Sequence, residues 1–161
     1  MSVSNVMDEK IEFIANGLSI EGMISRGTGT KGVVITHPHP QYGGDMYNPV
    51  VESIGHVYQQ KGITTLRFNF RGVGLSDGSY GDGIGEQEDV LAAVACLKKQ
   101  GVDDIDLAGY SFGAWVNAHI EAGAGPISTL IMVSPPVAFM GFDTDITLPR
   151  LGLVVSGSRD E

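Results

Sequence analysis

The sequence predicts an α/β fold with a mostly parallel sheet, helices on both faces and an N-terminal antiparallel hairpin. Unbroken apolar runs recur along the chain, at residues 33–35, 63–70, 105–108, 127–133 and 151–155. Such runs are typical of parallel strands that are covered on both faces. Segments with helical spacing separate the runs, and this alternation implies right-handed crossovers. The hairpin is predicted because Asn16-Gly17, a strong two-residue turn signal, lies between two strand-like segments.

Helices are expected between these strands. Asn48 can cap a helix whose first turn contains Pro49 and which ends before Gly62. Its inner face is expected to hold apolar residues: Val50, Ile54 and Val57 or Tyr58. A second helix is expected at 85–99, because acidic residues at its start and lysines at its end complement the helix dipole. Its core face is expected to consist of Val90, Ala93, Val94 and Leu97. A third apolar-periodic segment spans 112–122.

Length and composition favour one domain with a small-molecule substrate. A chain of 161 residues fits a single core, and the roughly seventeen residues between the last two strands are too few for a cap domain. The net charge of −9 argues against nucleic acid or an anionic membrane as a partner. The lone Cys96 forms no intrachain disulfide, and no segment has the length of a signal peptide core or of a membrane span. We therefore expect a soluble, unsecreted, cytoplasmic protein, with oligomer formation possible.

A candidate nucleophile is Ser111, in the pentapeptide Gly109-Tyr110-Ser111-Phe112-Gly113. The motif lies between a strand-like and a helix-like run, and a sharp strand-to-helix turn with small residues on both sides of the serine would expose its hydroxyl. A serine that merely caps the helix is the alternative, but capping does not explain the paired glycines. The same pattern occurs at 74–78, around Ser76, in a glycine-rich stretch that is expected to be a loop.

Two backbone N–H groups are candidates for stabilising an oxyanion. One is that of Phe112, at the helix N-terminus, and the other is expected in the loop after strand 33–36. Pro38 and Pro40 have no N–H, which leaves the amide of His39. A metal site at His37 and His39 is the less favoured interpretation, because a third ligand at usable spacing is missing. No metal or organic cofactor is implied.

The acid and the substrate contacts are predicted at the ends of other strands. Asp160 follows the last strand and is the candidate acid, whereas Asp143 and Asp145 are interpreted as solvent-facing. Arg71 and Tyr110 are candidates for substrate contacts. A substrate carboxylate could bind Arg71 or Arg159, but either arginine could equally pair with a loop aspartate.

The base that a serine nucleophile needs is not evident among the four histidines. His119 is about 12 Å along the same helix from Ser111, and His56 is expected on the helix after Pro49. His37 and His39 precede the nucleophile, an order that this arrangement does not use. The catalytic histidine is therefore expected beyond Glu161, or absent.

Several strings together resemble the α/β-hydrolase superfamily, and in particular small lid-less bacterial members described as predicted hydrolases or serine esterases. The resemblance covers nearly the whole chain and is carried by these segments: 37–40 with Gly43-Gly44, 66–76, the acidic helix start with Glu86 and Asp89, the turn at Ser111, Pro135-Pro136 and 157–160. It implies Ser111 as nucleophile, Asp160 as acid, and the Phe112 and His39 amides as oxyanion donors. It also implies a further strand, helix and histidine that this chain lacks.

The sequence thus predicts a serine hydrolase, carboxylesterase-like, that acts on small acyl esters through an acyl-enzyme. A non-catalytic interaction scaffold of the same fold is the alternative, favoured by the missing histidine and opposed by the intact turn. Dinucleotide binding through Gly72-Val73-Gly74 is a weaker alternative, because the third glycine comes one position late and no helix follows directly.

Overall fold

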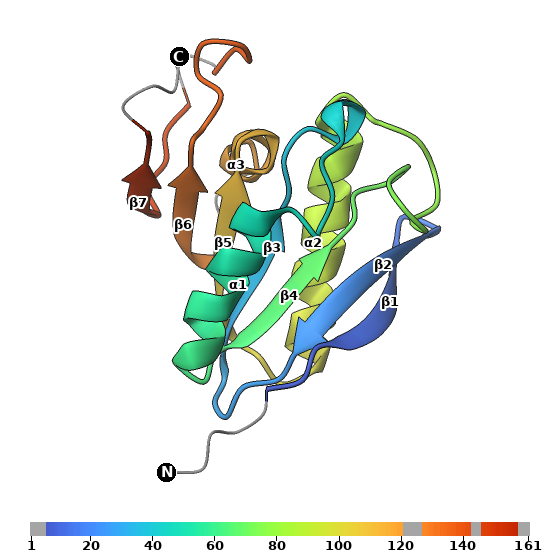
Figure 1. The fold of residues 1–161 in the computed structure, drawn as a ribbon, viewed down its shortest axis with the longest axis vertical. Helices are drawn as coiled ribbons and strands as arrows, with labels where there is room; N and C mark the ends of the chain where they lie inside the picture. Colours follow the sequence, from blue (N-terminus) through green and yellow to red (C-terminus); the bar gives the residue numbers. More distant parts are fainter. Residues whose placement is uncertain (1–5, 121–126, 143–145, 158–161) are drawn as a thin grey trace.

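The computed structural model describes residues 6–120, 127–142 and 146–157. Within them, seven strands form one sheet in the order β1-β2-β4-β3-β5-β6-β7 (Figure 1). The strands are β1 (Glu9–Ala15), β2 (Leu18–Ser25), β3 (Lys31–Thr36), β4 (Thr64–Phe68), β5 (Asp104–Tyr110), β6 (Ile127–Val133) and β7 (Leu151–Val155). The helices are α1 (Pro49–Gln60), α2 (Ile84–Lys99), α3 (Phe112–Ala118) and the short 3₁₀ helix η1 (Pro40–Tyr42).

The predicted fold class is confirmed. Strands β1 and β2 form an antiparallel hairpin, β2 pairs antiparallel with β4, and the pairs from β4 to β7 are parallel. Alternate residues of the central strands face different helices. Val34 and Leu107 belong to the core that α2 and α3 cover, whereas Val33 and Ala108 pack with Val51 of α1. Helices therefore cover both faces of the sheet (Figure 1).

Helix α1 begins where the sequence predicted, and its inner face was predicted correctly except at Val50 and at the alternative Val57. The side chain of Asn48 accepts a hydrogen bond from the Val50 N–H at 2.9 Å. Val51, not Val50, is buried, and Val57 is 52% exposed, whereas Ile54 and Tyr58 pack toward the sheet as expected. Gly55 shares the buried face, and a Cβ there would lie 3.4 Å from Ile35 Cδ1. Val51 and Gly55, one helical turn apart, thus face the sheet together.

The other helices follow the predicted pattern with one difference in length. All four predicted core residues of α2 are buried. Helix α3 ends at Ala118, before the predicted end, and the His119 N–H closes a tighter turn by donating to the Val116 carbonyl. None of the helices in the described ranges is both long and apolar enough to cross a lipid bilayer.

Strand β7 lies at the sheet edge opposite the hairpin (Figure 1). Its apolar side chains are 40% to 52% exposed in this chain: Leu151, Leu153, Val154 and Val155. The apolar side chains of this edge strand are therefore only partly covered by the described residues.

Candidate active site

Ser111 forms the turn between β5 and α3. Its backbone has φ 52° and ψ −115°, a region that side-chain-bearing residues rarely adopt. The Ser111 N–H donates to the Val133 carbonyl of β6 at 2.9 Å, and the Trp115 N–H donates to the Ser111 carbonyl at 3.2 Å. The Ser111 hydroxyl makes no capping hydrogen bond. Ser111 is the N-cap residue of α3 by position, but the alternative interpretation, in which its side chain serves to cap the helix, finds no support in its hydrogen bonds.

The two glycines of the motif allow close contacts between backbone segments. A Cβ on Gly109 would lie 2.4 Å from the Ala114 nitrogen, and a Cβ on Gly113 would lie 2.6 Å from the Thr36 carbonyl oxygen. Gly109 thus lets α3 fold back onto β5, and Gly113 lets α3 contact the end of β3. Any larger residue would push the helix away and change the direction of the serine.

The amides of Phe112 and His39 have no hydrogen-bond acceptor among the residues that the structure describes. Phe112 is the first residue of α3, so its N–H has no partner within the helix. His39 follows the end of β3, the strand next to β5. Parallel strands end at the same edge of a sheet, so both amides lie at the edge that carries Ser111.

The His39 side chain is held by polar and aromatic contacts. Its Nδ1 accepts from the Gln41 N–H at 3.1 Å, and its Nε2 lies 3.2 Å from the Tyr80 hydroxyl. Its ring centroid is 4.7 Å from that of Tyr42 and 4.8 Å from that of Phe112. Burial lowers the pKa of His39. Because Nδ1 accepts a hydrogen bond, it carries no proton, and the ring is a fixed, neutral part of the loop after β3.

His37 is completely buried and joins the ends of two strands. Its Nε2 accepts from the Phe70 N–H at 3.0 Å, and its Nδ1–H donates to the Pro38 carbonyl at 2.7 Å. Desolvation lowers the pKa of His37 from 6.5 to about 4. Each of the two rings thus makes one hydrogen bond within the loop, His37 to Pro38 and His39 with Gln41, and one to a distant segment. Within the described residues, no group of three or more His, Cys, Asp or Glu side chains is placed to hold a metal ion.

Burial of neutral His37 makes the stability of the chain pH-dependent. The folded pKa of about 4 lies below the ordinary 6.5, so the unfolded chain binds the proton first as the pH falls. The His37 contribution is complete above pH 6.5 and is lost between about 6.5 and 4, a difference of about 3 kcal/mol. Urea denaturation at pH 7.0 and 4.5 measures this loss. His37→Gln is expected to lose less stability over this interval, and equal losses in both proteins would contradict the assignment.

The remaining histidines are also bound locally. His119 Nδ1 lies 2.7 Å from the Trp115 carbonyl, and its ring contacts the indole, as expected for a residue at the core edge. His56 is exposed on α1 and contacts Gln60. No contact joins a histidine to Ser111 within the described part of the chain. The candidate acid Asp160, its alternatives Asp143 and Asp145, and Arg159 lie outside the described residues.

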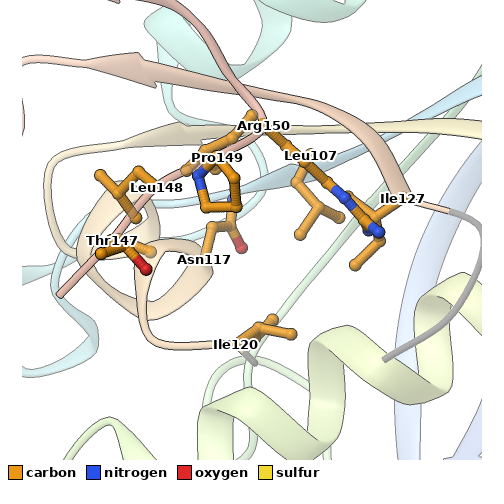
Figure 2. Close-up of a pocket in the computed structure, with 10 residues that line it drawn as sticks. Leu107, Asn117, Ile120, Ile127, Thr147, Leu148, Pro149 and Arg150 are labelled. Carbon is orange, nitrogen blue, oxygen red and sulfur yellow. The ribbon is translucent and has the colours of Figure 1, made fainter. Parts of the chain in front are cut away.

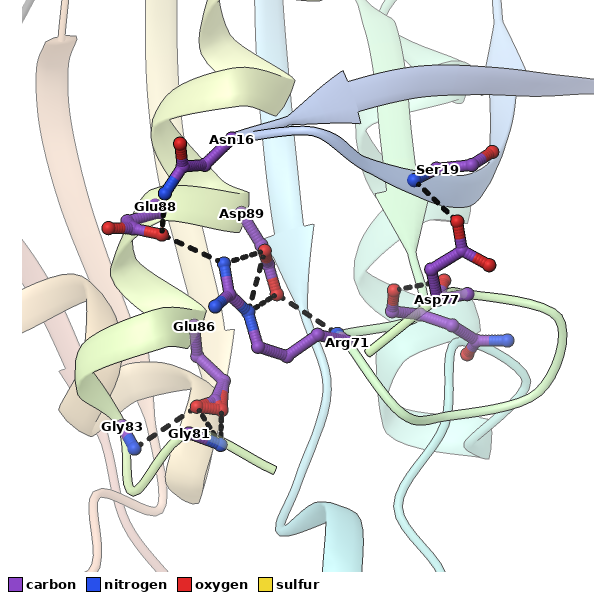
Figure 3. Close-up of polar contacts among 11 residues, drawn as sticks. Asn16, Ser19, Arg71, Asp77, Gly81, Gly83, Glu86, Glu88 and Asp89 are labelled. Carbon is purple, nitrogen blue, oxygen red and sulfur yellow. Dashed lines mark hydrogen bonds and ion pairs between the residues drawn. The ribbon is translucent and has the colours of Figure 1, made fainter. Parts of the chain in front are cut away.

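Arg71 is bound to carboxylates of the chain itself. Its Nε and Nη2 donate to both oxygens of the buried Asp89 at 2.8 to 3.3 Å, and Nη2 also donates to Glu88 at 3.1 Å (Figure 3). The expectation that Arg71 holds a substrate carboxylate is therefore replaced by a structural role, with helix carboxylates rather than a loop aspartate as partners. The side chain of Tyr110, the other candidate, packs against the small core under α1.

The second motif serine, Ser76, has a structural role. Its hydroxyl donates to the Asn69 carbonyl at 2.7 Å and accepts from the Glu21 N–H at 3.0 Å. The residue is 7% exposed and lies in a loop, as predicted. The pattern alone does not distinguish Ser76 from Ser111, whereas the backbone around each serine does.

Sequence reasoning missed Tyr80 and named Glu86 only as part of the acidic helix start, without its contacts. Glu86 is buried at the start of α2, and its carboxylate accepts from the N–H groups of Gly81 and Gly83 (Figure 3). Burial raises its pKa, and these hydrogen bonds oppose that shift. An acidic residue three positions after a cap is a recognisable signal for such a contact. The contact of Tyr80 with His39 has no local signal.

A separate cavity of about 50 Å³ lies between α3, β6 and the segment before β7 (Figure 2). It is lined mostly by apolar side chains, including Leu107, Ile127 and Leu148, together with Asn117 and Arg150. None of the predicted site residues lines it. We therefore place the candidate site at the strand edge near Ser111 and not in this cavity.

Known proteins resemble the chain over most of its length. An α/β serine hydrolase homologue from Coxiella burnetii is 38% identical, with a TM-score of 0.83, and the match covers 95% of this chain and 76% of that protein. XC6422 from Xanthomonas campestris, an α/β serine hydrolase without a lid, is 30% identical with a TM-score of 0.83, over 97% and 73% of the two chains. No family model matches the sequence.

A curated relative gives a sequence match of similar strength. The uncharacterized protein RP471 of Rickettsia prowazekii is 33% identical over 148 residues, which are 88% of this chain. The chain spans 62% of the length of that relative. The sheet order, the turn at Ser111 and the similarity to both serine hydrolase structures all indicate the same family. The chain belongs to the α/β-hydrolase superfamily.

Proposed function

We propose that this chain carries the nucleophile of a serine hydrolase that acts on small carboxylic esters through an acyl-enzyme, with Ser111 as that nucleophile. The observation that carries the proposal is the strained Ser111 backbone between β5 and α3, with a side chain that makes no capping bond. Strain at a residue with φ 52° is maintained only where the surroundings enforce it, and such positions cluster at functional sites.

In the proposed reaction, Ser111 Oγ attacks the ester carbonyl carbon and its proton passes to a base. The Phe112 and His39 N–H groups stabilise the carbonyl oxygen as it becomes negative. The alcohol leaves with the proton, and water then hydrolyses the acyl-Ser111 bond by the same route. We propose that a histidine outside these 161 residues is the base and that Asp160 orients it.

The surroundings of the proposed nucleophile favour an apolar, accessible substrate. In the segment after β6, the strand beside β5, Val137 and Phe139 are 69% and 81% exposed. An exposed apolar pair at the same edge of the sheet as the proposed nucleophile is suited to contact an acyl chain or an apolar alcohol. No cofactor takes part in the proposed reaction. We propose a cytoplasmic location for the protein from its composition.

A fluorophosphonate probe on the full-length protein tests the proposal. Wild type is expected to be labelled at one site, Ser111→Ala is expected to lose the label, and the matched variant Ser76→Ala is expected to keep it. Absence of labelling in folded wild type, or a label that persists in Ser111→Ala, would refute the proposed function.

A non-catalytic scaffold is the second candidate. The observation in its favour is that all four histidines of the chain have local contacts and none contacts Ser111. The same labelling experiment separates the two candidates, because a scaffold has no reason to activate one serine above the other.

A further inference from the structure

His39 makes three hydrogen bonds within the loop after β3. The His39 carbonyl accepts from the N–H groups of Tyr42 and Gly44, at 3.1 and 3.0 Å. The side chain caps η1 through the Gln41 N–H. Gly44 packs directly on the start of the loop, where a Cβ would lie 2.1 Å from the Pro38 carbonyl oxygen. The orientation of His39 therefore determines the direction of its own N–H.

The hydrogen bond between His39 and Tyr80 has a defined direction. Because Nδ1 accepts from the Gln41 N–H, the proton of the neutral ring is on Nε2. Nε2–H therefore donates to the Tyr80 hydroxyl oxygen, at 3.2 Å. The two rings also pack together, with centroids 5.1 Å apart. Tyr80 is thus the acceptor that fixes the ring from the side opposite Gln41.

The residues before and after Tyr80 in the sequence are held in place by contacts of their own. The Gly81 N–H donates to both oxygens of the buried Glu86 carboxylate, at 2.9 and 3.1 Å (Figure 3). Ser79 packs on Gly72, where a Cβ would lie 2.9 Å from the Ser79 Cα. Gly83 packs on Trp115 of α3, with a Cβ position 2.2 Å from the indole. The Tyr80 hydroxyl is therefore presented from a fixed backbone.

We propose that Tyr80 is a positioning residue for ester hydrolysis: its hydroxyl holds the His39 ring and so aims the His39 N–H at the oxyanion. The proposal rests on the proposed function, because it assigns a role within that reaction. Tyr80 acts through His39 and needs no contact with the substrate. Its effect is on the transition state, where the charge on the oxygen is largest.

Tyr80→Phe keeps the ring and removes the acceptor. In the full-length protein it is expected to lower kcat for a small aryl ester about tenfold, because a misdirected donor weakens oxyanion stabilisation. KM is expected to change less than twofold, and fluorophosphonate labelling to become slower but reach the wild-type end point. Tyr42→Phe is the matched control: its ring also packs on His39, but its hydroxyl makes no hydrogen bond among the described residues and is expected to be dispensable.

Amide hydrogen exchange supplies a measurement that does not need activity. The N–H groups of Tyr42 and Gly44, which donate to the His39 carbonyl, are expected to exchange faster in Tyr80→Phe and at the wild-type rate in Tyr42→Phe. Unchanged exchange, an unchanged kcat, or an equal loss of kcat in both variants would overturn the proposal. Failure of wild type to label would refute the proposed function separately, and the exchange rates would still decide whether Tyr80 holds the loop.

Discussion

Replacing Ser111 by glycine is expected to abolish ester hydrolysis while raising the free energy of unfolding by about 1 kcal/mol. Its φ of 52° and ψ of −115° strain a side-chain-bearing residue, which costs about 1 to 3 kcal/mol. Glycine adopts this conformation without a steric cost but loses about 0.5 to 1 kcal/mol of additional chain entropy on folding. Urea denaturation and an ester hydrolysis assay on the same protein measure both effects.

Ser76→Gly is the matched control, because it makes the same change within the same sequence pattern. It removes two hydrogen bonds, to the Asn69 carbonyl and from the Glu21 N–H, and is expected to lower the free energy of unfolding by about 2 kcal/mol. Its effect on hydrolysis is expected to be small. A loss of stability in Ser111→Gly as large as that in Ser76→Gly would contradict the prediction that the Ser111 backbone is strained.

The sequence was sufficient for the fold because its strongest signals are local. The turn Asn16-Gly17 fixes the hairpin, and the spacing of Val90, Ala93, Val94 and Leu97 fixes the core face of α2. Such patterns follow directly from the two periods of regular structure. The inner face of α1 was predicted less well. Which residues of α1 face the sheet depends on contacts with distant segments, such as that of Val51 with β3, and these contacts have no signature in the helix itself.

In the candidate site too, the features with local sequence signals were predicted and the contacts between distant segments were not. The place of Ser111 followed from its setting between a strand and a helix, and the Phe112 amide followed from the helix start. The buried bond of His37 to the Phe70 N–H and the contact of His39 with Tyr80 join residues 33 and 41 positions apart. Only the packing of the sheet brings those residues together. The sequence therefore indicated which residues could react, but not which residues hold them in place.

Asp89→Ala is expected to lower the free energy of unfolding by about 3 to 5 kcal/mol. Asp89 is completely buried and accepts from the Arg71 guanidinium and from the Arg71 N–H, at 2.9 Å in the second case. Its loss leaves an arginine side chain that is only 13% exposed without its main counter-charge. Removing one partner of a buried ion pair costs far more stability than the intact pair contributes. Urea denaturation at neutral pH measures the change.

Glu88→Gln tests whether burial, and not the charge of Arg71, determines this effect. Glu88 binds the same guanidinium at 3.1 Å, but its side chain is 47% exposed, and exposed ion pairs contribute about 0 to 1 kcal/mol. A similar loss of stability in both variants would contradict the assignment of the effect to the burial of Asp89. Because Arg71 begins the loop that leads to Tyr80, Asp89→Ala is also expected to speed amide exchange at Gly72, whose N–H donates to the Asp77 carbonyl. The Arg71–Asp89 pair would then hold one end of the segment 71–80, and Tyr80, which contacts His39, lies at its other end.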